Sequence, residues 1–312
     1  MLTPTRIGSF TDFFAGIHHA RAASRALGAG DAVGPNYRWV PIAYQSRAST
    51  VRPSGTDVRR PSGQLARPDA DPIYAPCDML DFELELGWFV GEPTVAGQPV
   101  GIGDANRHIA GFCLLNDWSA RDIQRWEMAP LGPFLAKNFA TTISSWMVTA
   151  DALRPFRVPA MPRSEDEPRP LPYLWDDDDQ AAGGVAIDLT VWLRTAEMRA
   201  RGADAVPLLR SNARHLYWTP AQMLTHHTSS GCDLQTGDLL GSGTISGPAP
   251  DQLASLLELT DHGRHPLTLP SGETRAYLQD GDEVTFTGRC QREGRVPIGF
   301  GECAGTVVAA GA

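Results

Sequence analysis

Acidic and apolar residues alternate along Met79–Val90, which is M-L-D-F-E-L-E-L-G-W-F-V. With the two-residue period of a β-strand, Asp81, Glu83 and Glu85 fall on one face and apolar side chains on the other. Three like charges in one row are costly to bury unless a cation compensates them, and hard divalent cations prefer carboxylate oxygens. Two interpretations are open at this point. The segment is either a metal-binding strand inside the protein or an edge strand with a solvated acidic face.

Length and composition are those of a globular protein with many turns. Of the 312 residues, 42% are apolar and 20% are charged, and 31 are glycine and 25 proline. This favours a β-rich fold over a helical bundle, and we expect a single domain over residues 1–312. The net charge of −9 argues against nucleic acid and against an anionic membrane surface as partners. No apolar run approaches the length of a membrane span.

The cysteines and the N-terminal residues predict a cytoplasmic protein. The five cysteines are odd in number and form no C-x-x-C pair, so neither a disulfide framework nor a zinc ribbon is indicated. Free thiols are typical of a reducing compartment. The first residues, M-L-T-P-T-R-I-G-S-F-T-D, contain no apolar signal core.

The first candidate site residues are Asp12 and His19. A helix is expected over Phe13–Leu27 with Asp12 at its cap, which would place Asp12 and His19 on one helical face, about 10 Å apart along the axis. Both could then face one cavity, Asp12 as a ligand and His19 as a base beyond a substrate. The alternatives are a plain cap and a packed or exposed histidine.

A second polar group follows a short apolar strand expected over Ile109–Leu115. A helix from about Trp118 would align four residues on one stripe, namely Asp117, Arg121, Gln124 and Met128, and Lys137 follows among apolar residues. This arrangement would direct a carboxylate, a guanidinium and an amide into one cleft. The alternative is an amphipathic surface helix in which Arg121 pairs with Asp117.

The remaining segments complete the expected order of elements. Residues 154–184 are interpreted as a surface loop or insertion, with the Asp176–Asp179 run in solvent. Strands are expected at residues 144–148, 184–193, 255–260, 283–287 and 296–308, the third of them carrying Glu258, and a helix is expected at 212–227. The glycines of Gly231–Pro248 match neither a dinucleotide fingerprint nor a phosphate-binding loop, and they indicate tight turns.

Five motifs, taken in order, resemble the fumarylacetoacetate hydrolase family, and most closely its fumarylacetoacetase branch. They are T-D-F-F with His19 downstream, L-D-F-E-L-E-L, N-D-W-S-A-R-D-I-Q-R-W-E, L-G-P-F-L-A-K-N-F and G-D-L-L-G-S-G-T-I-S-G-P. The resemblance runs from about Thr11 to Gly305. It implies a β-rich α+β fold, a mixed β-sandwich roll, without the SH3-like domain that precedes it in that branch. It also implies a homodimer, one Mg²⁺ or Ca²⁺ ion and a small-molecule β-dicarbonyl substrate.

The resemblance also assigns roles to individual residues. It implies four metal ligands, Asp12, Glu83, Glu85 and Asp117, and five catalytic residues, His19, Glu258, Arg121, Gln124 and Lys137. His19 would be the water-activating base and Glu258 the carboxylate that orients it. Tyr44 and Thr244 match substrate-pocket positions, and Thr141 matches a contact to a second, structural cation.

This chain departs from the branch at substrate-binding positions. Phe14 and Met128 stand where the branch has tyrosine, and an arginine expected near Leu27 or Gly28 is replaced, with Arg25 close but displaced. A pocket that loses two phenols and a guanidinium binds a carboxylate less well. We therefore expect the chemistry to be retained with a less anionic, larger acyl group in the substrate.

Three functions are compatible with these residues. The first is metal-dependent hydrolysis of a C–C bond in a β-diketone, with water activated by His19. The second is metal-dependent decarboxylation, isomerisation or hydration of a 2-oxo acid or a specialised biosynthetic intermediate. The third is a non-enzymatic scaffold. The presence of both His19 and Glu258 favours hydrolysis, and five costly polar side chains argue against a scaffold.

Overall fold

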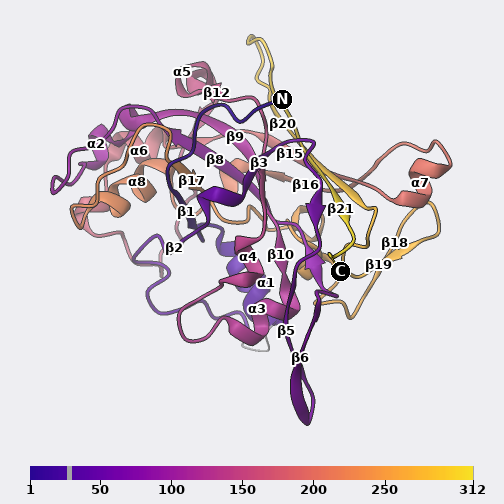
Figure 1. The fold of residues 1–312 in the computed structure, drawn as a ribbon. Coiled ribbons are helices and arrows are strands. Elements are labelled where there is room, and N and C mark those ends of the chain that lie inside the picture. The colour runs from indigo at the N-terminus through magenta and orange to yellow at the C-terminus, as the bar shows by residue number, and fades with distance from the viewer. Residues whose placement is uncertain (27–29, 312) are drawn as a thin grey trace.

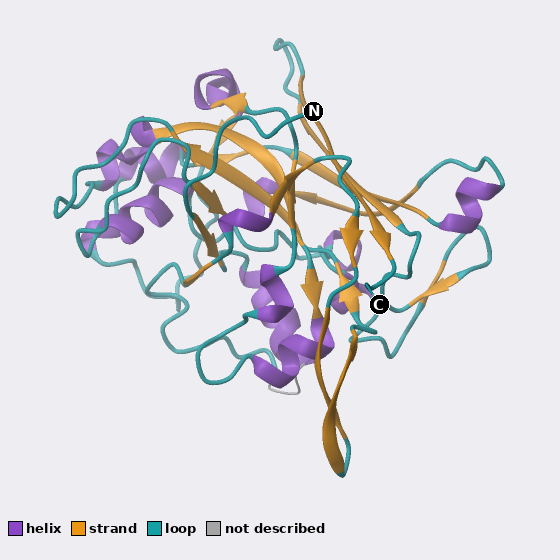
Figure 2. Cartoon of the chain, in the orientation of Figure 1, coloured by secondary structure: helices purple, strands orange, loops and turns teal. Residues whose placement is uncertain are grey.

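The computed structural model describes residues 1–26 and 30–311, which form two large β-sheets with helices at their margins (Figures 1 and 2). This confirms the predicted β-rich α+β fold. Among the described residues, none of the helices is long and apolar enough to cross a bilayer.

The eight-stranded sheet contains the chain's central strands. Its order is β2-β1-β17-β8-β9-β11-β3, and β12 also pairs with β9. The strands are β1 Phe10–Phe13, β2 Ala43–Gln45, β3 Val51–Pro53, β8 Leu84–Val90, β9 Ile109–Asp117, β11 Thr141–Ile143, β12 Val148–Thr149 and β17 Leu239–Gly241. The β1–β17 and β11–β3 pairs are parallel and the others antiparallel. The first and the last third of the sequence therefore meet in one sheet.

A five-stranded sheet in the order β16-β15-β20-β21-β4 covers β9. Its strands are β4 Val58–Arg59, β15 Asp188–Arg194, β16 Val206–Asn212, β20 Glu283–Cys290 and β21 Ile298–Val308. Between the sheets, Phe82 meets Phe286 edge-to-face with ring centroids 5.9 Å apart. A Cβ on Gly305 would lie 2.7 Å from the Trp118 ring, so the indole requires a glycine there. The larger hydrophobic cluster includes the residues packed between the two sheets, and a smaller cluster that includes Phe10, Phe89 and Leu115 is separate from it.

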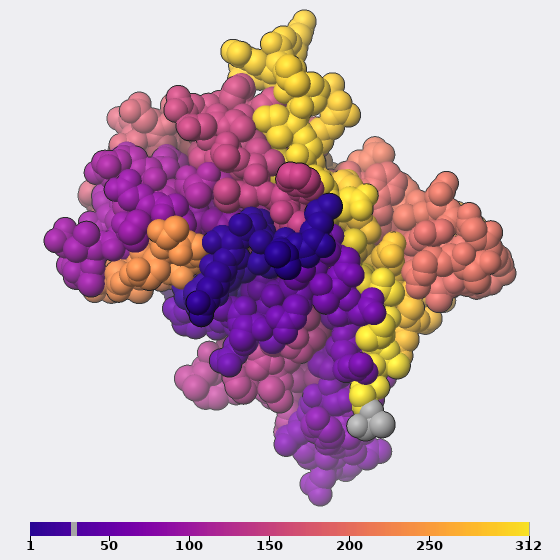
Figure 3. All heavy atoms as spheres, turned by 45° about the horizontal axis from the view of Figure 1, so that its top comes forward, coloured from indigo at the N-terminus to yellow at the C-terminus, as the bar shows by residue number. Residues whose placement is uncertain are grey.

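Short elements surround these sheets. Pairs of strands are β5 Ser62–Arg67 with β6 Ala70–Pro76, β7 Leu80–Asp81 with β10 Ser119–Ala120, β13 Arg157–Val158 with β14 Gly184–Val185, and β18 Leu267–Thr268 with β19 Thr274–Arg275. The helices are α1 Ile17–Ala26, α2 Ile102–Ala105, α3 Arg121–Glu127, α4 Leu135–Asn138, α5 Ala150–Leu153, α6 Asp177–Ala182, α7 Ala196–Ala200, α8 Pro220–Thr228 and α9 Leu256–Leu259. Six 3₁₀ turns are found at 48–50, 106–108, 154–156, 172–174, 213–215 and 250–252 in the described ranges. The β5–β6 hairpin, the β20–β21 tip and α7 project from the body (Figure 3).

The acidic strand runs through the interior. Asp81, Glu83 and Glu85 are all buried, at 0%, 6% and 1% exposure, and β8 pairs on both sides, with β17 and β9. The alternative of a solvated edge strand is therefore wrong. The predicted single strand is instead interrupted at Phe82–Glu83, because β7 leaves the sheet to pair with β10.

Several expected elements differ from the structure. Of the strand expected at 144–148 only Val148 lies on a strand, β12. The helix expected at 212–227 is the 3₁₀ turn at 213–215 followed by α8, which begins at Pro220 because Thr219 and Gln222 form a capping box there.

Three further differences concern site residues. Asp12 lies on β1 and does not cap a helix, because Phe10–Phe13 pairs with both β2 and β17 and α1 begins only at Ile17. The helix after β9 begins at Arg121, so Asp117 ends a strand and does not share a helical stripe with Arg121. Glu258 lies on α9, not on a strand, because Ser255 caps that turn by accepting a hydrogen bond from the Glu258 N–H.

Residues 154–184 contain β13, α6 and two of the 3₁₀ turns, and their status as an insertion stays a prediction. The Asp176–Asp179 run is only partly in solvent, which corrects the expectation. Asp179 is 5% exposed and accepts a 2.8 Å hydrogen bond from the Thr219 hydroxyl, while Asp177 and Asp178 are exposed. Burial raises the pKa of Asp179 to about 6, above its ordinary 3.8.

Asp179→Asn should stabilise the protein at pH 8 and have little effect at pH 4. The folded state holds the Asp179 proton more tightly than the unfolded chain. The stability contributed by this group is therefore present below about pH 3.8 and is lost as the pH rises through about 6. We expect a gain of about 2 kcal/mol in the free energy of unfolding at pH 8, measured by urea denaturation. Asp178→Asn on the exposed side of α6 is the control, and an equal gain at both pH values would contradict the prediction.

Candidate metal centre and catalytic site

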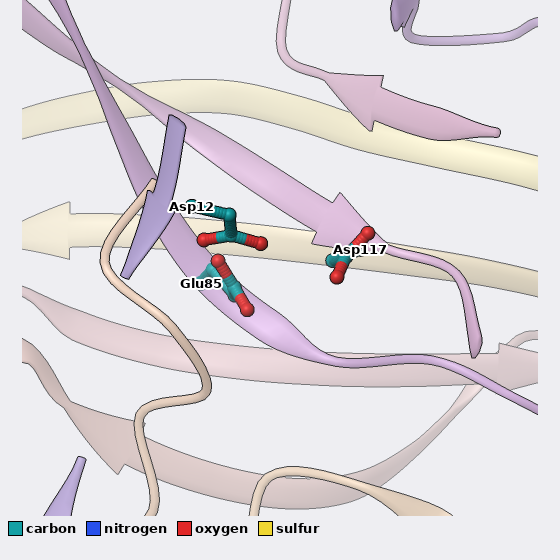
Figure 4. A group of neighbouring side chains, drawn as sticks. All are labelled: Asp12, Glu85 and Asp117. Atoms are coloured by element: carbon teal, nitrogen blue, oxygen red, sulfur yellow. The ribbon is translucent and has the colours of Figure 1, made fainter. Parts of the chain in front are cut away.

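Three carboxylates from three strands of the eight-stranded sheet converge in the interior. Asp12 comes from β1, Glu85 from β8 and Asp117 from the end of β9, and each offers an oxygen within 4.8 Å of the others (Figure 4). All three are at most 1% exposed. β17 separates β1 from β8 in the sheet, and Gly241 of β17 is paired with Asp12. A Cβ at this glycine would lie 2.4 Å from Asp12 Oδ1, so the lack of a side chain leaves room for the carboxylate.

The electrostatics of this cluster favour a cation. Burial, followed by the charge of Asp117, raises the pKa of Asp12 well above its ordinary value. Burial and then Asp12 and Asp117 do the same for the pKa of Glu85. Asp12 Oδ1 and Asp117 Oδ1 are buried without a hydrogen-bond partner among the described residues. Unpaired carboxylate oxygens in a dry site are what a hard divalent cation requires, so these residues fit a bound metal ion.

Glu83, the fourth expected ligand, lies outside this cluster and is paired with cations. Its Oε1 accepts a 2.6 Å hydrogen bond from Arg121 Nη1, and its Oε2 accepts one of 2.5 Å from Lys137 Nζ. Burial raises the pKa of Glu83, but Lys137 and Arg121 outweigh it and hold that pKa below its ordinary value. The same Lys137 Nζ donates to Asp117 Oδ2 over 2.6 Å, so one ammonium links Glu83 to the cluster. Arg121 makes no pair with Asp117, and that alternative is wrong.

The glycine motif G-S-G at Gly241–Gly243 lines the cluster. The backbone N–H of Gly243 donates to Glu85 Oε2 over 3.1 Å. This residue has a φ of +74°, and a Cβ there would lie 2.3 Å from the carbonyl oxygen of Phe13 on β1. Only glycine suits such a backbone. The predicted tight turn is therefore present, and it brings a hydrogen-bond donor to a carboxylate of the cluster.

His19 and Glu258 lie beside the carboxylates. His19 is on α1, 3% exposed, and its Nδ1 is 2.9 Å from Glu258 Oε2, while its Nε2 is 3.9 Å from Glu83 Oε1. Glu258 on α9 is held by the hydroxyls of Ser246 and Ser255, each over 2.8 Å at the shortest contact. Burial raises the pKa of Glu258, but His19 and these hydroxyls outweigh it and lower the pKa, so the carboxylate is ionised at neutral pH.

The cationic and amide side chains are grouped around Glu83. Arg121, the first residue of α3, donates to Gln124 Oε1 on the next helical turn over 3.2 Å. Lys137 on α4 is 5% exposed. Arg121, Gln124 and Lys137 are thus brought together as expected, although by a shorter helix than predicted.

The expected pocket residues occupy different places. The Tyr44 hydroxyl is within hydrogen-bond distance of Asp12 Oδ2, at 3.1 Å, and Asp117 Oδ2, at 2.8 Å. Phe14 packs edge-on against His19, with ring centroids 5.6 Å apart. Thr244, the residue after the glycine motif, is buried. Met128, the residue after α3, is 41% exposed. Thr141 is buried next to Asp117 in the β9–β11 register. The replaced arginine near Leu27 and Gly28 lies outside the described residues.

Three residues that hold the site together were not predicted from the sequence. Ser246 and Ser255 hold Glu258, and Asp81 pairs with Arg121 through contacts of 2.9 Å. A signal for Ser255 was present, because S-L-L-E at residues 255–258 matches the capping pattern of a helix start. Asp81 was seen only as a third acidic residue on the strand.

Comparison with known proteins agrees with this geometry. The family model described as fumarylacetoacetate (FAA) hydrolase C-terminal matches residues 9–308. Fumarylacetoacetase from Bos taurus is 48% identical over 313 residues, covering 99% of this chain and 72% of the relative. Fumarylacetoacetase from Homo sapiens is 47% identical over 99% of this chain and 72% of the relative. The enzyme from Arabidopsis thaliana is 46% identical, with coverages of 99% and 71%.

Solved structures show the same fold at lower identity. Fumarylacetoacetate hydrolase from Exiguobacterium antarcticum has a TM-score of 0.54 and 16% identity, covering 99% of this chain and 78% of that chain. Fumarylpyruvate hydrolase from Pseudomonas aeruginosa, solved with Mn²⁺ and pyruvate, has a TM-score of 0.53 and 16% identity, with coverages of 97% and 90%. The curated relatives indicate metal-dependent hydrolysis of a C–C bond, and the buried carboxylate cluster agrees with a metal requirement. The chain belongs to the fumarylacetoacetate hydrolase family.

Proposed function

We propose that this protein hydrolyses a β-diketone related to fumarylacetoacetate, cleaving the bond between the acyl carbonyl carbon and the carbon that joins the two carbonyl groups. The observation that carries the proposal is the His19–Glu258 pair beside the three-carboxylate cluster, with Nδ1 and Oε2 2.9 Å apart. Decarboxylation or isomerisation needs no such water-activating base. The pair therefore favours hydrolysis over decarboxylation and isomerisation, and hydration, which also uses an activated water, is distinguished by its intact carbon skeleton.

The proposed ligands of the metal are Asp12, Glu85 and Asp117, with Glu83 as the fourth. Mg²⁺ and Ca²⁺ are the proposed ions, because both prefer carboxylate oxygens. A bound divalent cation would supply Lewis acidity that polarises carbonyl oxygens. Glu83 is supported as a ligand by its lowered pKa, which keeps it anionic, and by Lys137, which links it to Asp117.

His19 takes a proton from water at Nε2 while Glu258 holds the ring at Nδ1 and stabilises the charged imidazolium. The hydroxide adds to the acyl carbonyl carbon. The C–C bond then breaks, the acyl part leaves as a carboxylic acid, and the departing carbanion takes a proton to become the α-carbon of a ketone. No other reactant is needed for this balance.

Arg121, Gln124 and Lys137 are proposed to stabilise the negative charge that develops on the acyl oxygen. Lys137 has a further N–H beyond those it donates to Glu83 and Asp117. Such a donor contributes about 3–4 kcal/mol when it faces the developing charge. Tyr44 and Thr244 are proposed to contact the substrate beside the metal.

The proposed substrate carries a less anionic and larger acyl group than fumarylacetoacetate. The Phe14 ring lies nearly perpendicular to the His19 ring and stands where the family branch has tyrosine, and Met128, just after α3, is exposed. Both replacements remove hydrogen-bond donors for a carboxylate and leave apolar surface.

The test is a product-resolved assay with the metal-stripped protein reloaded with Mg²⁺, Ca²⁺ or Mn²⁺. Fumarylacetoacetate, an acylpyruvate and an apolar β-diketone are compared, with Asp12→Asn as the metal-site variant. We expect a carboxylic acid and a ketone as products, a preference for the apolar diketone, and loss of cleavage in Asp12→Asn. Release of CO₂, or a product with an intact carbon skeleton, would contradict hydrolysis and favour the alternative reactions. Equal rates on fumarylacetoacetate and on the apolar diketone would contradict the proposed preference for a less anionic acyl group.

We further propose that the protein is a cytoplasmic homodimer. The cysteines are free throughout the described part of the chain, and four of them are buried, which suits a reducing compartment. Leu131 and Phe134 are 96% and 65% exposed, so an apolar surface is available for a second copy. Light scattering of the purified protein measures the mass, and a monomer at micromolar concentration would contradict the dimer.

A further inference from the structure

Asp81 is a completely buried carboxylate outside the cluster of Asp12, Glu85 and Asp117. Its Oδ1 accepts 2.8 Å hydrogen bonds from the backbone N–H groups of Phe82 and Leu256. Its Oδ2 accepts 2.9 Å hydrogen bonds from the Leu257 N–H and from Arg121 Nε, and Arg121 Nη2 lies 2.9 Å from the same oxygen. Both oxygens are therefore saturated with donors.

These donors belong to two different parts of the site. Leu256 and Leu257 open α9, and the first N–H groups of a helix have no partner inside the helix. Asp81 supplies that partner. Glu258 directly follows Leu257, and its Oε2 is 2.9 Å from His19 Nδ1. The other donor, Arg121, extends its Nη1 to Glu83. One carboxylate thus touches both the turn that carries Glu258 and the guanidinium beside Glu83.

We propose that Asp81 is a positioning residue that holds Arg121 and the His19–Glu258 pair in one frame. Its own oxygens are fully engaged by the protein, so it acts through these neighbours. The kinetic test of this assignment rests on the proposed function, because that proposal gives Arg121 and His19 their roles in the reaction.

The chemistry of the carboxylate explains why an amide cannot replace it. An ionised carboxylate only accepts hydrogen bonds, whereas an amide of the same shape brings N–H donors in place of one oxygen. In Asp81→Asn those donors would face either the N–H groups of α9 or the guanidinium of Arg121. One of the two must then move, and a displacement of about 1 Å in a catalytic frame costs about 100-fold in rate.

The first measurement compares kcat and KM of Asp81→Asn and Asp122→Asn on the diketone that the wild type cleaves best. Asp122 is the matched control because its carboxylate also binds backbone N–H groups, those of Asp78 and Met79, and adjoins Arg121 in the chain. We expect kcat to fall about 100-fold in Asp81→Asn with KM changed less than about threefold, and Asp122→Asn to stay near the wild type. An unchanged kcat in Asp81→Asn, or an equal fall in both variants, would overturn the proposal.

A double-mutant cycle with Glu258→Gln separates positioning from a general loss of stability. If Asp81 acts through Glu258, the double variant should be about as slow as the slower single variant, since the same interaction has already been removed. If the fold-reductions in kcat of the two single variants multiply in the double variant, Asp81 does not act through Glu258 and the assignment is overturned.

The third readout does not depend on turnover. The protein has eight histidines, and the ring-nitrogen signals of His19 can be assigned in ¹⁵N-labelled protein by their absence in His19→Gln. We expect Asp81→Asn to shift the His19 signals while Asp122→Asn leaves them in place, and unshifted signals would overturn the proposal. If the wild type cleaves no diketone, the proposed function fails and these spectra still decide the positioning. Should Asp81→Asn not fold, Asp81→Glu, which keeps the charge but moves it by one methylene, is taken through the same measurements.

Discussion

Replacing His19 with glutamine should lower kcat about 1,000-fold while leaving metal binding unchanged. His19 is the base proposed to remove a proton from water, and removal of a positioned general base costs about 10²–10⁴-fold in rate. The imidazole does not belong to the carboxylate cluster, so its loss leaves Asp12, Glu85 and Asp117 intact. The measurement is steady-state cleavage of the best diketone together with calorimetric titration of Mg²⁺ or Ca²⁺.

His18→Gln is the matched control for this experiment. His18 precedes His19 on α1 but is directed to His215, with ring centroids 6.1 Å apart, and it is only half-buried. We expect His18→Gln to keep kcat within about twofold, because ordinary surface changes have small effects. A His19→Gln protein with more than a tenth of the wild-type kcat would remove the assignment of His19 as the base.

Glu85→Gln should stabilise the metal-free protein and abolish its stabilisation by metal. Burial and the charges of Asp12 and Asp117 raise the pKa of Glu85, so an ionised Glu85 is a cost to the folded state without a cation. An amide of the same size removes that cost. With metal at about 100 times its dissociation constant, the wild type should gain about 2.7 kcal/mol, and the variant should gain almost none.

The measurement is thermal unfolding in EDTA and in a metal series at pH 7.5, for wild type and variant in parallel. The expected result is a crossing: the variant is the more stable protein in EDTA and the less stable one at saturating metal. Glu85→Asp serves as the control that keeps the charge, and it should remain less stable than Glu85→Gln in EDTA. A variant that is destabilised under both conditions would show that Glu85 has a structural role and does not belong to a metal site.

The alternation of Met79–Val90 was the strongest prediction from the sequence, because a period of two residues fixes which side chains share a face. It correctly placed Glu83 and Glu85 on one face of the strand, but it left open whether that face is solvated or, as the structure shows, buried. It could not show that Glu83 would be paired with Arg121 and Lys137 while Glu85 joins Asp12 and Asp117. Those partners come from distant segments, and their approach depends on sheet order, which local periodicity does not contain.

The prediction of helix or strand was wrong where tertiary pairing overrides the local preference of the sequence. Asp12 precedes the helix-compatible run Phe13–Leu27 and suits a cap, but Phe10–Phe13 pairs with β2 and β17, so Asp12 becomes a strand residue. The apolar residues around Glu258 suggested a strand, whereas a serine cap and the carboxylate of Asp81 stabilise a helical turn. The site residues themselves came from the family resemblance, and the structure adds the neighbours that hold them.

The pairing of β1 with β17 has a consequence for synthesis of the chain. Ser9 and Asp238 are joined by a 2.9 Å hydrogen bond although 229 positions separate them, and Asp12 lies beside Gly241. The strand that carries Asp12 therefore has no parallel neighbour until the ribosome has released Leu239–Gly241. Long-range pairings of this kind form slowly because the loop between them must close first. Until then β1 can pair only with β2, and its other edge stays open to pairing with other chains.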